Sequence, residues 1–164
     1  DEGPLFSVHC ERPVEALAAF KDSPLRFEPG TRFRYSSYGW ILVSAAVEAA
    51  AKEPFLSFMH SQVFAPLGMD QTDDDAAKEP IPGRATFYFP RFSADPRYGP
   101  DLMRDLDYSC YSGSSVFVST PSDMVRFALG IEGGKLLKPA TLTAAGRRIA
   151  GPCHHAPPHA GHPA

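Results

Sequence analysis

The residues best suited to chemistry lie in one aromatic, hydroxyl-rich stretch, which reads Phe-Arg-Tyr-Ser-Ser-Tyr-Gly-Trp over residues 33–40. Within it, Tyr35 and Ser37 are two positions apart and come just before a predicted helix. A sharp turn into that helix would let both hydroxyls face one cleft while the helix anchors them against the core. Hydroxyls both donate and accept hydrogen bonds, so we take this stretch as the candidate site.

Other sequence patterns with known chemistry are missing. The chain contains no Gly-x-Ser-x-Gly elbow, no glycine-rich phosphate loop, and no Cys-x-x-Cys or His-Glu-x-x-His motif. Before the C-terminal tail the histidines are His9 and His60, and neither lies beside a nucleophile and a carboxylate. Because His60 falls within a predicted helix, we expect a structural role for it. The acidic run over residues 70–82 lacks EF-hand spacing and its hinge glycine, which predicts a solvated loop.

The composition changes abruptly at the C-terminal end of the chain. Residues 151–164 carry four histidines, four prolines and one cysteine, without an apolar face. We predict that this segment is a disordered Pro/His-rich tail. Its prolines fit no standard spacing of zinc ligands, so we expect no metal site and no cofactor.

The three cysteines, Cys10, Cys110 and Cys153, are widely and irregularly spaced. An odd number at such spacing argues against a disulfide framework and leaves the redox compartment open. We therefore predict three free or buried thiols.

The elements that must hold the candidate stretch in place are mostly helical. Apolar residues recur at helical spacing from Gly39 to about Lys52, with alanines between them, which predicts the firmest helix in the chain. The small polar residues of 108–119 fit a backbone that passes close to a cleft, or equally an ordinary tight loop. The other predicted elements are helices over Pro13–Lys21, from Pro54 to about Met69, from the Thr120 cap to Gly133 and over Ala140–Ile149, and a short strand over Thr86–Phe89.

The bulk properties favour one ordinary globular domain with a small-molecule partner. The 164 residues are 43% hydrophobic and 21% charged, with a net charge of −3. This composition has no excess of positive charge that would attract nucleic acid or an anionic membrane. No apolar run approaches the ~20 residues of a membrane span. The chain starts without methionine or a signal peptide, so we expect a segment of something longer, with any targeting peptide upstream.

Three stretches, taken in order, resemble the serine β-lactamase and penicillin-binding-protein family, in particular its class C-like esterases and β-lactamase-related hydrolases. Residues 27–40 look like the approach to the family's Tyr-x-Asn motif, and Phe64–Met69 looks like the turn after its next helix. Val118–Met124, continuing to Leu137, is similar to a later helix and connection. The resemblance covers roughly residues 13–145. It implies an α+β fold, of which residues 1–150 form a partial, largely helical central region with short strands and without most of the sheet.

The resemblance assigns roles to individual residues. In such enzymes a serine of Ser-x-x-Lys attacks the acyl carbonyl while the tyrosine and lysine share the proton work. The resemblance makes Tyr35 the general base or proton relay. It makes Ser37 a substrate-binding residue at the position where the family has asparagine. None of the five lysines has serine three positions before it, so we expect the nucleophile upstream of Asp1. His159 and Gly161 are weak candidates for the family's His-x-Gly motif.

Two functions follow as expectations. The first is that this chain is part of a serine hydrolase that acts on an ester or amide through an acyl-enzyme, with the segment alone inactive. The alternative is a non-catalytic helical module that binds a peptide or protein partner on the same scaffold. The family implies a bacterial periplasmic or secreted setting, whereas substrate identity and oligomeric state stay open.

Overall fold

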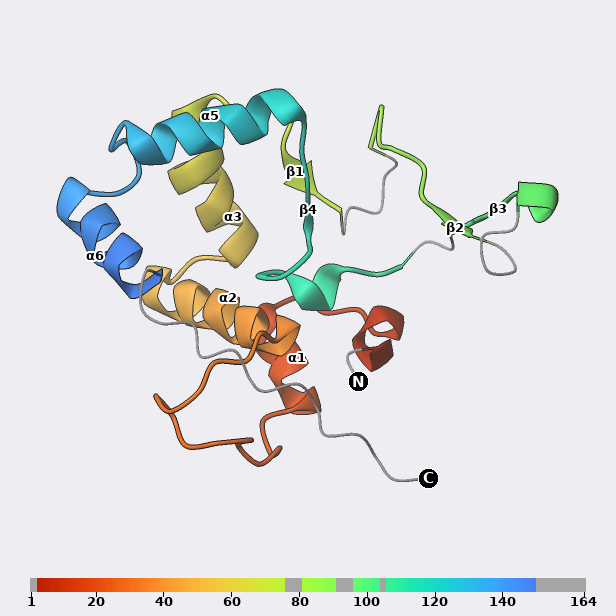
Figure 1. Ribbon diagram of the computed structural model, residues 1–164, viewed down its shortest axis with the longest axis horizontal. Helices are drawn as coiled ribbons and strands as arrows, with labels where there is room; N and C mark the ends of the chain where they lie inside the picture. The colour runs from red at the N-terminus through yellow and green to blue at the C-terminus, as the bar shows by residue number, and fades with distance from the viewer. Residues whose placement is uncertain (1–2, 76–80, 91–95, 104–105, 150–164) are drawn as a thin grey trace.

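The computed structural model describes residues 3–75, 81–90, 96–103 and 106–149, and these residues are largely helical with a few short strands (Figure 1). The predicted α+β class is therefore correct. The described helical elements are η1 (Gly3–Ser7), α1 (Pro13–Ala16), η2 (Leu17–Ala19), α2 (Ser37–Ala51), α3 (Phe55–Met59), η3 (His60–Phe64), α4 (Ala65–Leu67), η5 (Pro96–Tyr98), η6 (Ser109–Tyr111), α5 (Pro121–Glu132) and α6 (Pro139–Ile149).

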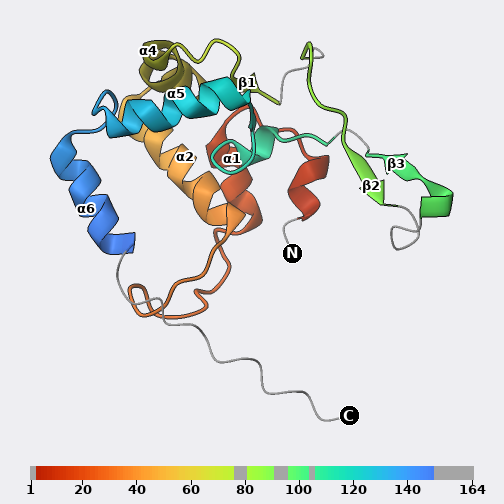
Figure 2. The same cartoon turned by 45° about the horizontal axis from the view of Figure 1, so that its top comes forward.

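The strands form two small antiparallel pairs. Strand β1 (Asp73–Asp74) pairs with β4 (Phe117–Val118), and β2 (Tyr88–Pro90) pairs with β3 (Pro100–Leu102). The β2–β3 pair projects away from the helices in both views (Figures 1 and 2). Such short pairs agree with the expectation of a fold region that lacks most of its sheet. The predicted strand over residues 86–89 is displaced toward its C-terminal end, and the described residues 31–35 form no strand.

Helix α2 is the central element of the larger core, as its alanine-rich sequence predicts. It ends at Ala51, and the capping residue Lys52 adopts a left-handed conformation with φ of 59°. Its buried residues Ile41, Ser44 and Glu48 recur every three or four positions and therefore lie on one face. The core beside it consists of Leu5, Cys10, Ala16, Ile41, Cys110 and Tyr111.

The predicted second helix is one continuous helical segment made of three parts, α3, η3 and α4. The middle part, η3, is a π-helical turn, a rare feature that occurs frequently at functional sites. The segment ends where the sequence predicts, at Gly68, whose φ of 66° suits glycine. Its buried face forms a second core of Phe64, Leu67 and Met69, against which Phe117 of β4 packs.

Helix α5 begins with the predicted cap. The hydroxyl of Thr120 accepts a hydrogen bond from the backbone N–H of Asp123, and Pro121 occupies the first helical position. The Asp123 carboxylate is fully buried and accepts bonds from the Gln71 backbone N–H and the Thr72 hydroxyl. The start of α5 is therefore joined to the segment that leads into β1.

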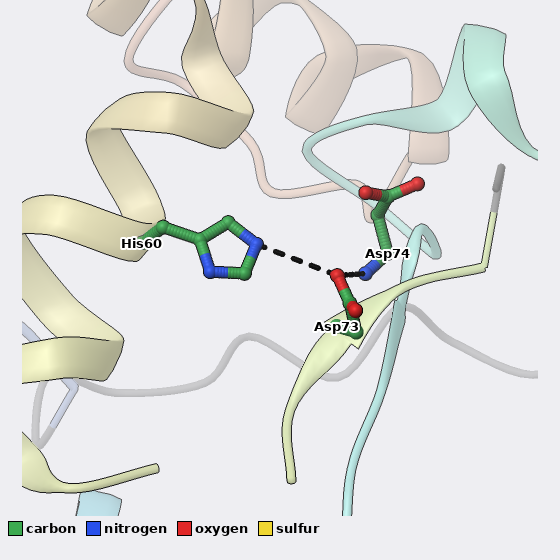
Figure 3. Close-up of side chains that lie close together, drawn as sticks. All are labelled: His60, Asp73 and Asp74. Atoms are coloured by element: carbon green, nitrogen blue, oxygen red, sulfur yellow. Dashed lines mark hydrogen bonds and ion pairs between the residues drawn. The ribbon is translucent and has the colours of Figure 1, made fainter. Parts of the chain in front are cut away.

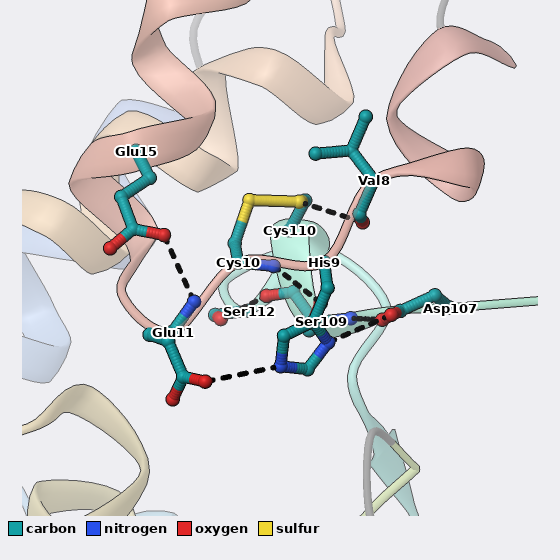
Figure 4. Close-up of a disulfide and its surroundings, with 9 residues drawn as sticks. All are labelled: Val8, His9, Cys10, Glu11, Glu15, Asp107, Ser109, Cys110 and Ser112. Carbon is teal, nitrogen blue, oxygen red and sulfur yellow. Dashed lines mark hydrogen bonds and ion pairs between the residues drawn. A yellow bond between two sulfur atoms is a disulfide. The ribbon is translucent and has the colours of Figure 1, made fainter.

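The cysteine prediction is wrong for two of the three residues. Cys10 and Cys110 form a disulfide across a sequence separation of 100 residues (Figure 4). Both are buried, because the segment before α1 and the turn η6 pack together in the core around α2. This proximity arises from tertiary packing, which the spacing of cysteines along the chain does not encode. Cys153 lies outside the described residues.

None of the described helices combines the length and the apolar character that crossing a bilayer requires. The predicted tail over residues 151–164 lies outside the described part of the chain, and so does the predicted domain boundary after residue 150.

Candidate functional site

The candidate stretch, residues 33–40, leads into helix α2, the helix that the sequence predicts after it. Tyr35 lies in an irregular segment with 63% of its surface exposed, and Ser37 is the half-buried first residue of α2. Ser36 occupies the N-cap position without forming a side-chain cap. The phenol of Tyr35 is therefore open to an incoming group, while Ser37 is fixed by the helix that follows.

Two contacts hold this end of α2 firmly. Tyr38 stacks on Phe20 with ring centroids 4.6 Å apart and an angle of 5° between the planes. In addition, a Cβ added to Gly113 would collide with the carbonyl oxygen of Trp40, so the loop after η6 lies against the α2 backbone. The loop within residues 108–119 thus lies close to the helix that carries Ser37, and the choice between a backbone beside a cleft and an ordinary tight loop stays open.

A second group of polar residues lies beside the disulfide (Figure 4). His9 Nδ1 is 2.8 Å from Asp107 Oδ2, and Asp107 Oδ1 accepts a bond from the Ser109 backbone N–H. Burial raises the pKa of the Asp107 carboxyl, but the bonds from Ser109 and the contact with His9 outweigh it and lower the pKa. Ser109 Oγ accepts a bond from the Cys10 backbone N–H. The group therefore ties the segment before α1 to the segment that leads into η6.

A third group brings His60 of η3 to the two carboxylates of β1 (Figure 3). His60 Nε2 is 3.5 Å from Asp73 Oδ1, and one ligand atom from each of His60, Asp73 and Asp74 lies within 4.8 Å of the others. His9 and His60 therefore each lie near a carboxylate from another part of the sequence, Asp107 and Asp73 respectively. The acidic residues belong to the run that we predicted as a solvated loop, and part of it is instead strand β1.

The weak candidates for the third motif, His159 and Gly161, lie outside the described residues. Their role stays a prediction.

Comparison with solved structures defines the class of fold. The chain superposes on a penicillin-binding protein from Bacillus halodurans with a TM-score of 0.69 and 22% identity, covering 86% of this chain and 42% of that one. It superposes on a D-amino acid amidase from Ochrobactrum anthropi, solved with L-phenylalanine amide, with a TM-score of 0.66 and 25% identity, covering 85% and 40%. The structure is thus a region of the β-lactamase/transpeptidase fold.

Sequence comparison agrees with the fold. The Beta-lactamase family model matches residues 4–162, and the chain belongs to the β-lactamase family. Relatives include the mitochondrial serine beta-lactamase-like protein LACTB of Mus musculus, 33% identical over 77% of this chain and 22% of that protein. The Homo sapiens LACTB protein is 33% identical over 71% of this chain and 20% of its own length. The chain therefore spans about a fifth of the curated relatives that it matches.

Proposed function

We propose that this chain contributes Tyr35 to the acyl-transfer site of a serine hydrolase that cleaves an ester or amide. In this proposal, a serine of Ser-x-x-Lys outside these 164 residues attacks the acyl carbonyl. Its proton passes to the tyrosine–lysine pair, which returns a proton to the leaving group. Water then hydrolyses the acyl-enzyme by the same route. Backbone amides stabilise the oxyanion in both steps.

The observation that supports the proposal is the placement of Tyr35 at the entrance to α2. Its phenol is largely exposed, yet the helix that follows is held by the Tyr38–Phe20 stack and by the loop at Gly113. A neutral phenol is a poor base, so in this proposal Tyr35 acts together with a nearby cation. The lysine of Ser-x-x-Lys is the group expected to supply that charge.

The first test uses the chain as it stands. Incubated with a chromogenic ester and with a labelled penicillin, it should turn over neither and form no covalent adduct, because no serine here has the required lysine partner. A full-length relative that carries Ser-x-x-Lys serves as the positive control. Mass-spectrometric detection of an acylated serine in this chain would overturn the assignment of the nucleophile.

The second test addresses Tyr35 itself in a longer polypeptide that joins this region to Ser-x-x-Lys. Replacing Tyr35→Phe removes only the hydroxyl and should lower kcat by about 10²- to 10⁴-fold, the usual size of a general acid–base contribution. The matched control is Tyr98→Phe, which removes the hydroxyl of another tyrosine of similar exposure. Equal activity of the Tyr35→Phe variant and the wild type would remove Tyr35 from the mechanism.

Ser37 is proposed as the substrate-binding residue that replaces the family's asparagine. A hydroxyl is shorter than an amide and cannot offer both a carbonyl and an NH₂ to the substrate. We therefore expect Ser37→Asn to improve hydrolysis of a β-lactam relative to a simple ester in the same longer polypeptide. An unchanged ratio of the two kcat/KM values would contradict this role.

The second candidate function is a non-catalytic module that binds a partner. The observation in its favour is that α2 exposes Trp40, Leu42 and Val43. Finding a Ser-x-x-Lys motif in the coding sequence upstream favours the enzyme, and finding none favours the module.

A further inference from the structure

We propose that His60, Asp73 and Asp74 form a binding site for one divalent transition-metal ion of the zinc class. An imidazole nitrogen and two carboxylate oxygens are a common donor set for such ions. Within the described part of the chain, this is the group of histidine, cysteine and acidic residues whose ligand atoms converge, all within 4.8 Å of one another. The site is separate from Tyr35 and Ser37 and does not depend on the proposed hydrolase activity.

The separation of the first two ligands fits a shared ion better than a direct bond. His60 Nε2 and Asp73 Oδ1 are 3.5 Å apart, beyond the ~2.7–3.2 Å of a good N–H···O hydrogen bond. Two atoms that each lie ~2.0–2.2 Å from one tetrahedral ion are roughly 3.3–3.6 Å apart. Binding would thus leave this pair in place and draw the Asp74 carboxylate, whose ligand atom lies within 4.8 Å of the other two, closer to them.

His9 also has acidic neighbours, but their arrangement differs from that around His60. His9 Nδ1 lies 2.8 Å from Asp107, a true hydrogen-bond distance. Its Nε2 faces Glu11 at 3.5 Å, on the opposite side of the ring. Because the two carboxylates approach different ring nitrogens, no single ion can bind both together with His9. The convergence at His60 is therefore not a general property of exposed histidines in this chain.

The surroundings of the cluster favour a cation. The three residues line a hollow of about 770 Å³, to which Asp70 adds a third carboxylate. Among the described residues that line this hollow there is no lysine or arginine to neutralise the acids. Its remaining walls include Leu56, Phe64 and Met69, and an apolar lining strengthens the attraction between the carboxylates and a bound ion.

The ligands are also held by the packing behind them. The His60 ring packs edge-on against Phe64, with centroids 5.2 Å apart, and Phe64 packs against Phe117 at 5.0 Å. Phe117 in turn lies opposite Asp74 in the β1–β4 ladder. The imidazole and the acidic strand are thus linked through two aromatic rings and a strand pair. The π-helical turn that begins at His60 adds a backbone feature typical of functional sites.

The test must separate this cluster from the tail, where Cys153 and four histidines can bind metal ions adventitiously. The full chain is therefore prepared with Cys153→Ser and with His154, His155, His159 and His162 changed to alanine. This tail-substituted background is titrated with Zn²⁺ by calorimetry and with Co²⁺ by visible absorption. We expect one ion per chain and the intense Co²⁺ bands of a four-coordinate site, with water as the fourth ligand. Ca²⁺ and Mg²⁺ should bind far more weakly, because they prefer sites made of oxygen alone.

Ligand variants in this background localise the ion. His60→Ala and Asp73→Asn should weaken Zn²⁺ binding by more than about 100-fold, since loss of even an outer partner costs about 10- to 100-fold. Asp74→Asn should also weaken it. His9→Ala is the matched control and should leave the affinity unchanged. Because Asp73 is exposed and His60 is only half-buried, the variants should keep the circular dichroism spectrum of the background.

A second readout follows from linkage, because an ion that binds only the folded state raises the melting temperature. Saturating Zn²⁺ should raise the melting temperature of the tail-substituted background and of His9→Ala, but not that of His60→Ala. The proposal is overturned if this background binds neither Zn²⁺ nor Co²⁺, if His60→Ala binds as tightly as the background, or if Ca²⁺ binds more tightly than Zn²⁺.

Discussion

Asp123 is a fully buried carboxylate whose ionised form is stabilised by its neighbours. Burial raises its pKa, but the Gln71 backbone N–H, the Thr72 hydroxyl and Arg126 outweigh burial and hold the pKa below its usual range. A depressed pKa contributes stability above the unfolded-state value of ~3.9. That contribution is lost as the pH falls through the lower, folded-state pKa.

We therefore expect Asp123→Asn to be less stable than the wild type at pH 7 and the difference to shrink at pH 3. Urea unfolding at both pH values measures it. Asp22→Asn, at an exposed position, is the control and should change stability little at either pH. A difference between wild type and Asp123→Asn that is the same at pH 7 and pH 3 would show that the ionised carboxylate is not the stabilising form.

At the scale of single elements, the start of α5 depends on one hydroxyl. Thr120→Ala removes the oxygen that accepts from the Asp123 N–H and should cost about 0.5–2 kcal/mol in the free energy of unfolding. Thr120→Ser keeps that oxygen and should lose much less. Chemical denaturation of the three proteins distinguishes these cases, and equal losses for alanine and serine would contradict the capping role.

The elements that the sequence predicts well are those determined by near neighbours. The alanine-rich run of α2, the Thr120-Pro121 start of α5 and the glycine at residue 68 each act within one or two turns of chain. The strands are too short for an alternating pattern, since β1 has two residues. Its formation depends on pairing with β4, more than forty residues away, so composition alone gave a solvated loop.

The candidate site was likewise only partly predictable from the sequence. Its anchoring helix was predictable from apolar spacing, but the buried face was not. The spacing singles out Trp40 and Val43, which are about half exposed, whereas the structure buries Ile41 together with the polar residues Ser44 and Glu48. The contacts of His9 with Asp107 and of His60 with Asp73 join residues 98 and 13 positions apart, and no local pattern connects them. The pairing of Cys10 with Cys110 was missed for the same reason, because the spacing of cysteines along the chain does not show which two meet in the fold.

At the scale of the whole molecule, the disulfide joins the segment before α1 to the turn η6. Changing both partners, in Cys10→Ala/Cys110→Ala, should cost about 2–5 kcal/mol, because a long loop is no longer closed in the unfolded chain. The matched control is Cys153→Ser, which removes the remaining cysteine and should leave stability unchanged. Thermal unfolding compares the three proteins. Equal melting temperatures for the double variant and the wild type would contradict a stabilising disulfide.

Two of the described helices, α2 and α5, expose several large apolar side chains. On α2, Leu42 and Val43 have exposed fractions of 53% and 49%. On α5, Val125 and Leu129 have exposed fractions of 58% and 60%. Exposed apolar patches mark interaction surfaces or promote association. We therefore expect the isolated chain to self-associate, with a sedimentation coefficient that rises with concentration. Leu42→Lys/Leu129→Lys should reduce this association, whereas a monomeric, cooperative melt of the wild type would contradict it.

The Cys10–Cys110 bond also changes the connectivity of the molecule, because it turns most of the chain into a covalent ring from which only the two ends emerge. A protease that cuts once anywhere between the two cysteines opens the ring without releasing a fragment. The nicked protein keeps its full mass on a denaturing gel until a reductant is added, and only then separates into two pieces. Resistance to proteolysis judged without reductant would therefore overstate how intact the backbone is.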